Sequence, residues 1–260
     1  MKVIDQINYA AKNAPKGVID DIIYHENELG FTEFLQLEKT KKYYADVPLK
    51  HIVALGRDDF WEKGNSWRDA VDGLRGENWP ISVFDYFEAE LRDIPFPAPN
   101  SRFELRLGAA GGLFNCGNGN HRLVAGKAWL LNKYNDEAKL KKVKILHRPL
   151  FDEAKKLFQS LVDLGGDIQF SYVHYPETEY EKVDGKSVHC YIRSQRDPNT
   201  IYAWVRNYVI QVDTKKSLLQ RMLPIPAWYK SREWITVEAR LVKLLLDDHW
   251  LLDKSTEAID

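Results

Sequence analysis

A glycine- and asparagine-rich segment near the middle of the chain, "CGNGNHRLVAG" (residues 116–126), carries the residues best suited to chemistry. It lies between an apolar run and a stretch of helical periodicity, which predicts a turn from a strand into a helix. The first N–H groups of a helix lack partners within the helix, and the helix dipole adds partial positive charge there. Gly117 and Gly119 would let the backbone approach a ligand closely.

The side chains of this segment add donors for an anion. Arg122 can donate two parallel hydrogen bonds to phosphate oxygens, and His121 offers a further donor. Asn118 and Asn120 tolerate unusual backbone conformations and can cap a helix. We therefore predict an anion site, most naturally for phosphate, whose residues are Gly117, Asn118, Gly119, Asn120, His121 and Arg122. The alternative is an ordinary polar loop, because short motifs often arise by chance.

The elements around this segment mix helices and strands, which predicts an α+β fold. Helical periodicity dominates residues 1–45, followed by strands at 47–55 and 80–88 and a short helix at 66–75. Two short strands joined by "AAGG" indicate a hairpin before the glycine-rich segment, and "KKVKILHRP" predicts a strand after its helix. Beyond Pro149 a helix should run from Phe151 to Leu164. Strands at 167–175, 187–193 and 201–212 and helices at 214–223 and 232–252 should follow.

This pattern divides the chain into three parts. We expect a helical N-terminal extension at 1–46, a central domain at 47–150 and a mixed strand and helix region at 151–260.

The composition limits the classes of function. The 37 basic and 38 acidic residues give a net charge of -1, which argues against a uniformly basic nucleic-acid binder. The two cysteines, Cys116 and Cys190, are too few and too far apart for a disulfide framework or a zinc site. The N-terminus lacks the apolar core of a signal peptide, and no apolar run is long enough to span a bilayer. These features predict a cytoplasmic protein with no membrane partner.

The segment "GNGNHRLVAGKAW" resembles the signature of the ParB/sulfiredoxin-like fold, in which a strand ends in a G-x-H-R turn that leads into a helix. The order of the neighbouring segments is similar too. "VPLKHI" resembles the opening strand of that fold, "DGLRGENWPISVF" its helix, glycine and next strand, and "KKVKILH" the strand after the motif helix. The resemblance covers about residues 47–149.

The branches of this fold imply different activities. Sulfiredoxins carry a cysteine directly before the His-Arg pair, where this chain has Asn120, and Cys116 lies four residues earlier. ParB proteins bind CTP and DNA, but neither their second nucleotide motif nor a helix-turn-helix is apparent here. Kinases of free serine use an acidic residue after the first strand, where this chain has Asp58, Asp59 and Glu62. The alternative to a catalytic role for "RDDFWE" is a solvated charged turn with no part in the chemistry.

Aromatic and basic residues occur together elsewhere. Trp67, Arg68, Arg75 and Trp79 could stack on a nucleic-acid strand, although a helix with buried tryptophans and exposed arginines is the preferred interpretation. The C-terminal segments "AWVRNY" and "PAWYKSREW" fit a core or a protein interface better than a nucleic-acid site, because that region has no net basic charge.

The leading hypothesis is a nucleotide-binding protein. Its ligand would be ATP, ADP or CTP with Mg²⁺, and it would hydrolyse the nucleotide or transfer a phosphoryl group. Asp58, Asp59 or Glu62 would act as the acid, the base or a metal ligand. A second hypothesis is a DNA-associated ParB-like binder or nuclease of a plasmid or phage. A third is a non-catalytic interaction module that holds a protein partner through its aromatic C-terminal region.

Overall fold

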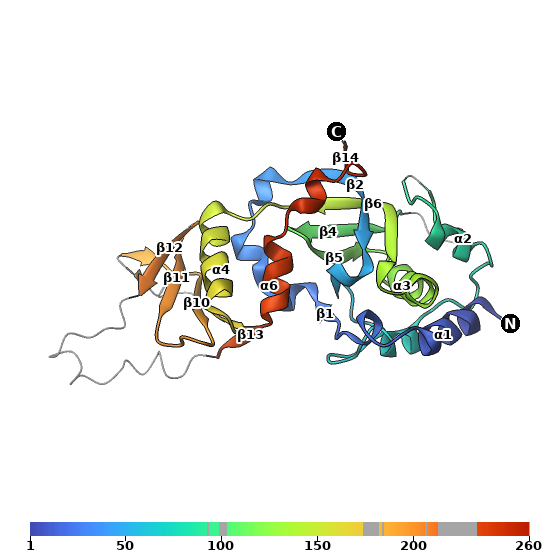
Figure 1. The fold of residues 1–260 in the computed structure, drawn as a ribbon, viewed down its shortest axis with the longest axis horizontal. Helices are drawn as coiled ribbons and strands as arrows, with labels where there is room; N and C mark the ends of the chain where they lie inside the picture. The colour runs from blue at the N-terminus through green and yellow to red at the C-terminus, as the bar shows by residue number, and fades with distance from the viewer. Residues whose placement is uncertain are drawn as a thin grey trace. The chain divides into compact units, whose positions relative to one another are not determined.

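The computed structural model describes residues 1–92, 94–98, 103–173, 182–183, 185–205, 207–212 and 233–259. Helices and mixed sheets are both present, as the α+β prediction requires (Figure 1). The chain forms two compact units. Unit 1 contains Met1–Gly30, Gln36–Pro149 and Asp247–Asp260, and unit 2 contains Phe31–Leu35 and Leu150–Leu246. The N-terminal segment and the last residues of the chain thus belong to the same unit as the glycine-rich turn.

The sheet of unit 1 has the strand order β1-β3-β5-β4-β6-β2-β14. On one side, β1 (Tyr24–His25), β3 (Ile52–Leu55) and β5 (Leu113–Asn118) run parallel to one another. The carboxyl ends of these three strands therefore lie at one edge of the sheet, where ligands of open α/β sheets commonly bind.

The rest of the sheet fixes β5 from its other side. β4 (Arg106–Ala110) forms the predicted hairpin with β5 and pairs in parallel with β6 (Lys139–His147). β2 (Lys41–Pro48) lies antiparallel to β6, and β14 (Glu257–Ile259) completes the sheet beside β2.

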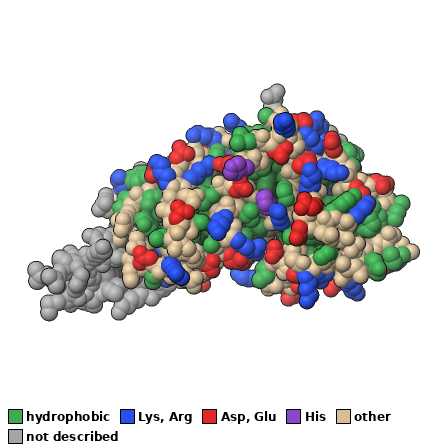
Figure 2. All heavy atoms as spheres, viewed as in Figure 1, with side chains coloured by type: hydrophobic (Ala, Val, Ile, Leu, Met, Phe, Trp, Pro, Cys, Tyr) green, Lys and Arg blue, Asp and Glu red, His purple; other side chains and the backbone are tan. Residues whose placement is uncertain are grey.

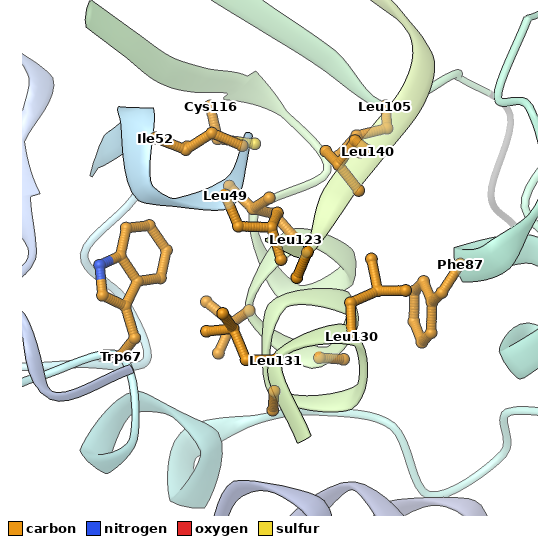
Figure 3. Close-up of a cluster of buried hydrophobic side chains, with 14 of the residues drawn as sticks. Leu49, Ile52, Trp67, Phe87, Leu105, Cys116, Leu123, Leu130, Leu131 and Leu140 are labelled. Atoms are coloured by element: carbon orange, nitrogen blue, oxygen red, sulfur yellow. The ribbon is translucent and has the colours of Figure 1, made fainter. Parts of the chain in front are cut away.

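Helix α3 (Asn120–Tyr134) is the central helix of unit 1, and α1 (Val3–Asn13) and α2 (Val83–Glu88) both contact it. Its residues Leu123, Leu130 and Leu131 are buried in the core cluster that also holds Ile52 of β3 and Cys116 of β5 (Figure 3). Burial of such side chains is worth roughly 1.5–3 kcal/mol each, so the helix that begins at the glycine-rich turn is firmly anchored.

Unit 2 contains an antiparallel sheet and two helices. The strand order is β12-β11-β10-β7-β13. The strands are β7 (Ile168–Tyr172), β10 (Cys190–Ser194), β11 (Ile201–Val205), β12 (Tyr208–Val212) and β13 (Ile235–Val237), beside the small hairpin of β8 (Lys182–Val183) and β9 (Lys186–Ser187). The helices α4 (Asp152–Leu164) and α6 (Ala239–Leu246) pack together. Its aromatic core contains Phe34, Phe158, Phe170 and Trp204.

Several predicted elements are wrong in the structure. The strand predicted at 80–88 is a turn followed by helix α2, because Val83, Phe84, Tyr86 and Phe87 are all buried and this spacing is helical rather than alternating. The strand predicted at 47–55 is interrupted by a 3-10 turn at Leu49–His51, so it forms the end of β2 and the separate strand β3.

The N-terminal and C-terminal helical predictions also need correction. After α1, residues up to 40 form short 3-10 turns and β1, because Gly17 and Gly30 take positive φ angles of 136° and 67° that interrupt a helix. The helix predicted at 232–252 begins only with α6, since the β-branched residues Ile235–Val237 join the sheet as β13. The helix predicted at 214–223 lies outside the described residues, as does most of "PAWYKSREW".

Acidic and basic side chains are interspersed on the face of the molecule drawn in Figure 2, which agrees with the balanced net charge. Among the described helices, none has the length and apolar character that crossing a bilayer requires.

Candidate functional site

Gly119 joins β5 to α3 and adopts a left-handed conformation with a φ angle of 91°. Its carbonyl accepts the first hydrogen bond of the helix from the Leu123 N–H at 2.9 Å. A Cβ atom at this position would lie 2.7 Å from Leu105 Cδ1 and 3.1 Å from Arg122 Nε. The turn therefore requires glycine for two reasons, its φ angle and the space around it.

The two asparagines of the turn bind neighbouring segments and do not cap α3 as the sequence suggested. The buried Asn120 side chain accepts a hydrogen bond from the Gly56 N–H at 3.0 Å through Oδ1. Asn118 donates from Nδ2 to the Glu104 carbonyl at 2.6 Å. Asn120 thus fixes the start of α3 to the end of β3, which explains its burial beside a polar loop.

A cavity of about 500 Å³ opens at this turn. Its size falls within the range of ligand sites in proteins. All six residues of the predicted anion site line it, together with cationic and aromatic side chains from other segments. The lining residues are Arg57, Arg75, Trp79, Phe96, Phe103, Gly117, Asn118, Gly119, Asn120, His121 and Arg122.

The three arginines of the cavity come from different segments and differ in their contacts. Arg57 follows β3, is exposed, and makes no ion pair or side-chain hydrogen bond with any described residue. Arg75 forms an ion pair with Asp59 at 3.3 Å, and both side chains remain largely open to solvent. Arg122 donates from Nη1 to the Phe103 carbonyl at 2.7 Å, and its guanidinium also interacts with the Tyr86 hydroxyl.

The His121 side chain is half-buried between Phe60 of the loop after β3 and the segment that contains Arg75. Its ring stacks on Phe60 with 4.0 Å between the ring centroids, and its Nδ1 lies 3.4 Å from the Arg75 backbone nitrogen, which donates to it. Burial lowers the pKa of His121, the charges of Arg75 and Arg57 lower it further, and only Asp59 acts in the opposite direction. Together these effects favour the neutral imidazole over the charged form.

Aromatic rings form another part of the cavity. Trp79 and Phe96 meet edge to face with 5.0 Å between their centroids, and the Arg122 guanidinium lies 5.3 Å from the Phe96 centroid. Gly76 allows this arrangement, since a Cβ there would lie 3.1 Å from the Trp79 ring. Phe103 is 72% exposed although it is a large apolar residue, so its ring is free to stack on a ligand.

The predicted carboxylates Asp58, Asp59 and Glu62 are not among the lining residues of the cavity. All three lie on the exposed loop after β3. Of the three carboxylates, Asp59 interacts with lining residues of the cavity, because it pairs with Arg75 and its charge favours the protonated form of His121. The backbone N–H of Glu62 binds Asn65 within a local turn, which keeps Glu62 in that loop.

Glu26 is a carboxylate near the site that the sequence patterns did not reveal. Glu26 directly follows β1, and the parallel register of β1 with β3 places it beside Gly56. A Cβ on Gly56 would lie 3.2 Å from Glu26 Oε1, and Asn115 Nδ2 donates to Glu26 Oε2. The strand β1 has only two residues, so its sequence gave too little alternation to reveal this position.

Cys116 is fully buried in β5, and burial raises the pKa of its thiol to about 12. A thiol in this environment is not a nucleophile at neutral pH. Within the described part of the chain, no cluster of three or more His, Cys, Asp or Glu side chains could hold a metal ion. The lining residues of the cavity also include no carboxylate, so they do not fit a resident Mg²⁺ site.

Comparison with known proteins gives no relative of this chain: no family model, no curated protein and no solved structure matches it.

Some of the other lining residues could be recognised as candidates from the sequence. Arg75 and Trp79 stood out as an aromatic and basic pair, although the preferred interpretation treated them as parts of an ordinary helix. Phe96 lies within a proline-rich connection and Phe103 just after it, where periodicity carries no information about their neighbours. Arg57 lies in the same loop as the three predicted carboxylates.

Proposed function

We propose that the cavity at the β5–α3 turn binds a nucleotide. The observation that carries the proposal is the composition of its lining, which combines arginines and a histidine at a helix start with three aromatic side chains. Phosphate groups and a base require these two kinds of surface. The strand, G-x-H-R-like turn and helix, followed by β6, also support a ParB/sulfiredoxin-like origin for unit 1, which we include in the proposal.

The phosphates would lie against the cationic side of the cavity. The guanidinium groups of Arg57 and Arg75 can each donate several hydrogen bonds, and charged pairs of this kind are stronger than neutral ones. The first turn of α3 adds backbone N–H groups and the positive end of the helix dipole. Gly117 is exposed at this turn, so a phosphate oxygen can come close to its backbone.

The base would lie against the aromatic side. Trp79 and Phe96 form a wall in which their rings already pack edge to face. The exposed Phe103 ring offers a flat surface on which any base can stack, and such stacking is worth roughly 1–3 kcal/mol per base. Stacking does not depend on the identity of the base, so ATP, ADP and CTP all remain candidate ligands.

The proposal extends to hydrolysis or transfer of the terminal phosphoryl group, which needs a carboxylate to accept a proton. Asp59 and Glu26 are the two candidates. Asp59 reaches the site through its ion pair with Arg75, and Glu26 lies beside Gly56 at the carboxyl edge of the parallel strands. Mg²⁺ would have to enter with the phosphates.

Binding measurements with matched arginine variants test this proposal. ATP, ADP and CTP are titrated against the wild type, Arg57→Ala, Arg75→Ala and Arg240→Ala. Arg240 is an exposed arginine of unit 2 that pairs with Glu238, so it controls for loss of a surface charge. Because hydrogen bonds to charged groups are worth roughly 1.5–3 kcal/mol, each cavity variant should weaken binding by about tenfold or more.

Two outcomes would contradict nucleotide binding. Equal affinities of the cavity variants and Arg240→Ala would place the nucleotide elsewhere. No binding of any nucleotide to the wild type, with tight and strongly salt-dependent binding of a single-stranded oligonucleotide, would favour the DNA-associated hypothesis instead.

A further inference from the structure

The Nδ1 atom of His121 faces a hydrogen-bond donor. The Arg75 backbone N–H points at this nitrogen across 3.4 Å. A proton on Nδ1 would bring two N–H groups against each other, so the contact requires an unprotonated Nδ1. The proton of a neutral imidazole must then reside on Nε2, since one ring nitrogen donates and the other accepts.

The groups around the ring also disfavour a charged imidazole. The loop after β3 contributes Arg57 and Asp59, and the segment after the 3-10 helix at Asp69–Gly73 contributes Arg75. Asp59 is the one acidic group among them, and it is already paired with Arg75. The flat face of the ring lies on Phe60, which offers neither a hydrogen-bond acceptor nor a charge.

The Nε2 atom is available to a ligand. His121 lines the cavity, and among the described residues no side chain or backbone group forms a hydrogen bond with its Nε2. The arginines therefore supply the positive charge of the site, while His121 supplies a directed donor.

We propose that His121 serves the cavity as a neutral imidazole whose Nδ1 accepts from the Arg75 backbone and whose Nε2–H donates to a phosphate dianion. This inference rests on the proposed nucleotide site and specifies the ionic form of the ligand that the site selects. A phosphate ester loses its second proton with a pKa of about 6, so the dianion dominates at pH 7 and above.

A neutral donor predicts a particular dependence of affinity on pH. Binding of ADP, measured in the absence of divalent metal, should strengthen from pH 5 to pH 7 as the terminal phosphate ionises. It should then stay constant to pH 8.5. A cationic His121 predicts the opposite trend, a loss of affinity as pH rises through the pKa of the imidazole.

The ionisation state can be read directly by long-range ¹H–¹⁵N NMR of the side-chain imidazoles. The His121 signals are assigned by their loss in His121→Gln. We expect the pattern of the neutral Nε2–H tautomer at pH 7, with or without ADP. The imidazolium pattern or the Nδ1–H tautomer would overturn the inference.

Binding by three variants gives the second readout. Glutamine can accept from the Arg75 N–H and donate to phosphate without a charge, so His121→Gln should hold ADP within about threefold of the wild type. His121→Ala should lose about tenfold, the worth of one hydrogen bond to a charged group. His249→Gln, a change at an exposed histidine paired with Asp247, is the control and should bind as the wild type does.

The results separate this inference from the proposed function. If the wild type binds ADP but His121→Gln loses as much affinity as His121→Ala, the neutral donor is wrong and the nucleotide site stands. If the wild type binds no ADP, the nucleotide site fails, and the NMR spectrum still decides the state of His121.

Discussion

Two glycines in one turn should respond very differently to the same substitution. Gly119→Ala forces an L residue into a left-handed conformation with φ at 91°, which disfavours it by roughly 1–2 kcal/mol. The new Cβ would also lie 2.7 Å from Leu105 Cδ1, a buried side chain, and relieving such overpacking costs about 1–3 kcal/mol. The sum predicts a loss of about 2–5 kcal/mol in the free energy of unfolding.

Gly117→Ala is the matched control. The nearest atom to its new Cβ is the Arg106 carbonyl oxygen at 3.8 Å, an ordinary contact. The free energy of unfolding should therefore stay within about 0.5 kcal/mol of the wild type.

Gly119→Ala should also weaken nucleotide binding, since its Cβ would lie 3.1 Å from Arg122 Nε and push that guanidinium aside. Urea unfolding followed by tryptophan fluorescence measures the stability, and titration with ADP measures the affinity. Equal stability of Gly119→Ala and Gly117→Ala would refute the account of the turn.

Three further substitutions or conditions test the elements that position the site. Asn120→Ala should destabilise the protein by about 0.5–1.5 kcal/mol in urea unfolding, because it removes one of the two acceptors of the Gly56 N–H and leaves the Cys116 carbonyl as the other. Gly126→Ala should lower the melting temperature, since its Cβ would lie 2.9 Å from the Phe87 ring between α3 and α2; an unchanged value would refute that contact. Burial lowers the pKa values of His121 and His51 in the folded state. The stability that the two neutral histidines contribute should be complete above about pH 6.5 and should decline as pH falls below that value. Unfolding measured between pH 5 and 8 should show a smaller decline for the double variant His51→Gln, His121→Gln than for the wild type.

The turn and its hairpin could be predicted because the information is local. Glycine and asparagine between an apolar run and a helical pattern indicate a strand-to-helix turn wherever they occur, and the structure has this turn at Gly119. The role of Asn120 could not be predicted in this way. Its partner Gly56 lies far away in sequence, and the parallel pairing of β3 with β5 brings the two together.

The rest of the cavity depends on tertiary contacts. Arg57 and Arg75 reach the turn because the loop after β3 folds back, with the Phe60 carbonyl packed so closely on Gly73 that a Cβ there would overlap it. Sequence periodicity cannot reveal that two loops come this close to each other. Helix α2 shows a different limit, because short apolar runs fit strand and helix alike until burial decides between them.

A crystal structure with a non-hydrolysable ATP analogue bound tests the central claim most directly. The analogue should lie in the cavity, with its phosphates within hydrogen-bond distance of His121 and Arg57 or Arg75 and its base against Phe103 or Trp79. An analogue bound at another surface, or a cavity that stays empty at a saturating concentration of the analogue, would contradict it.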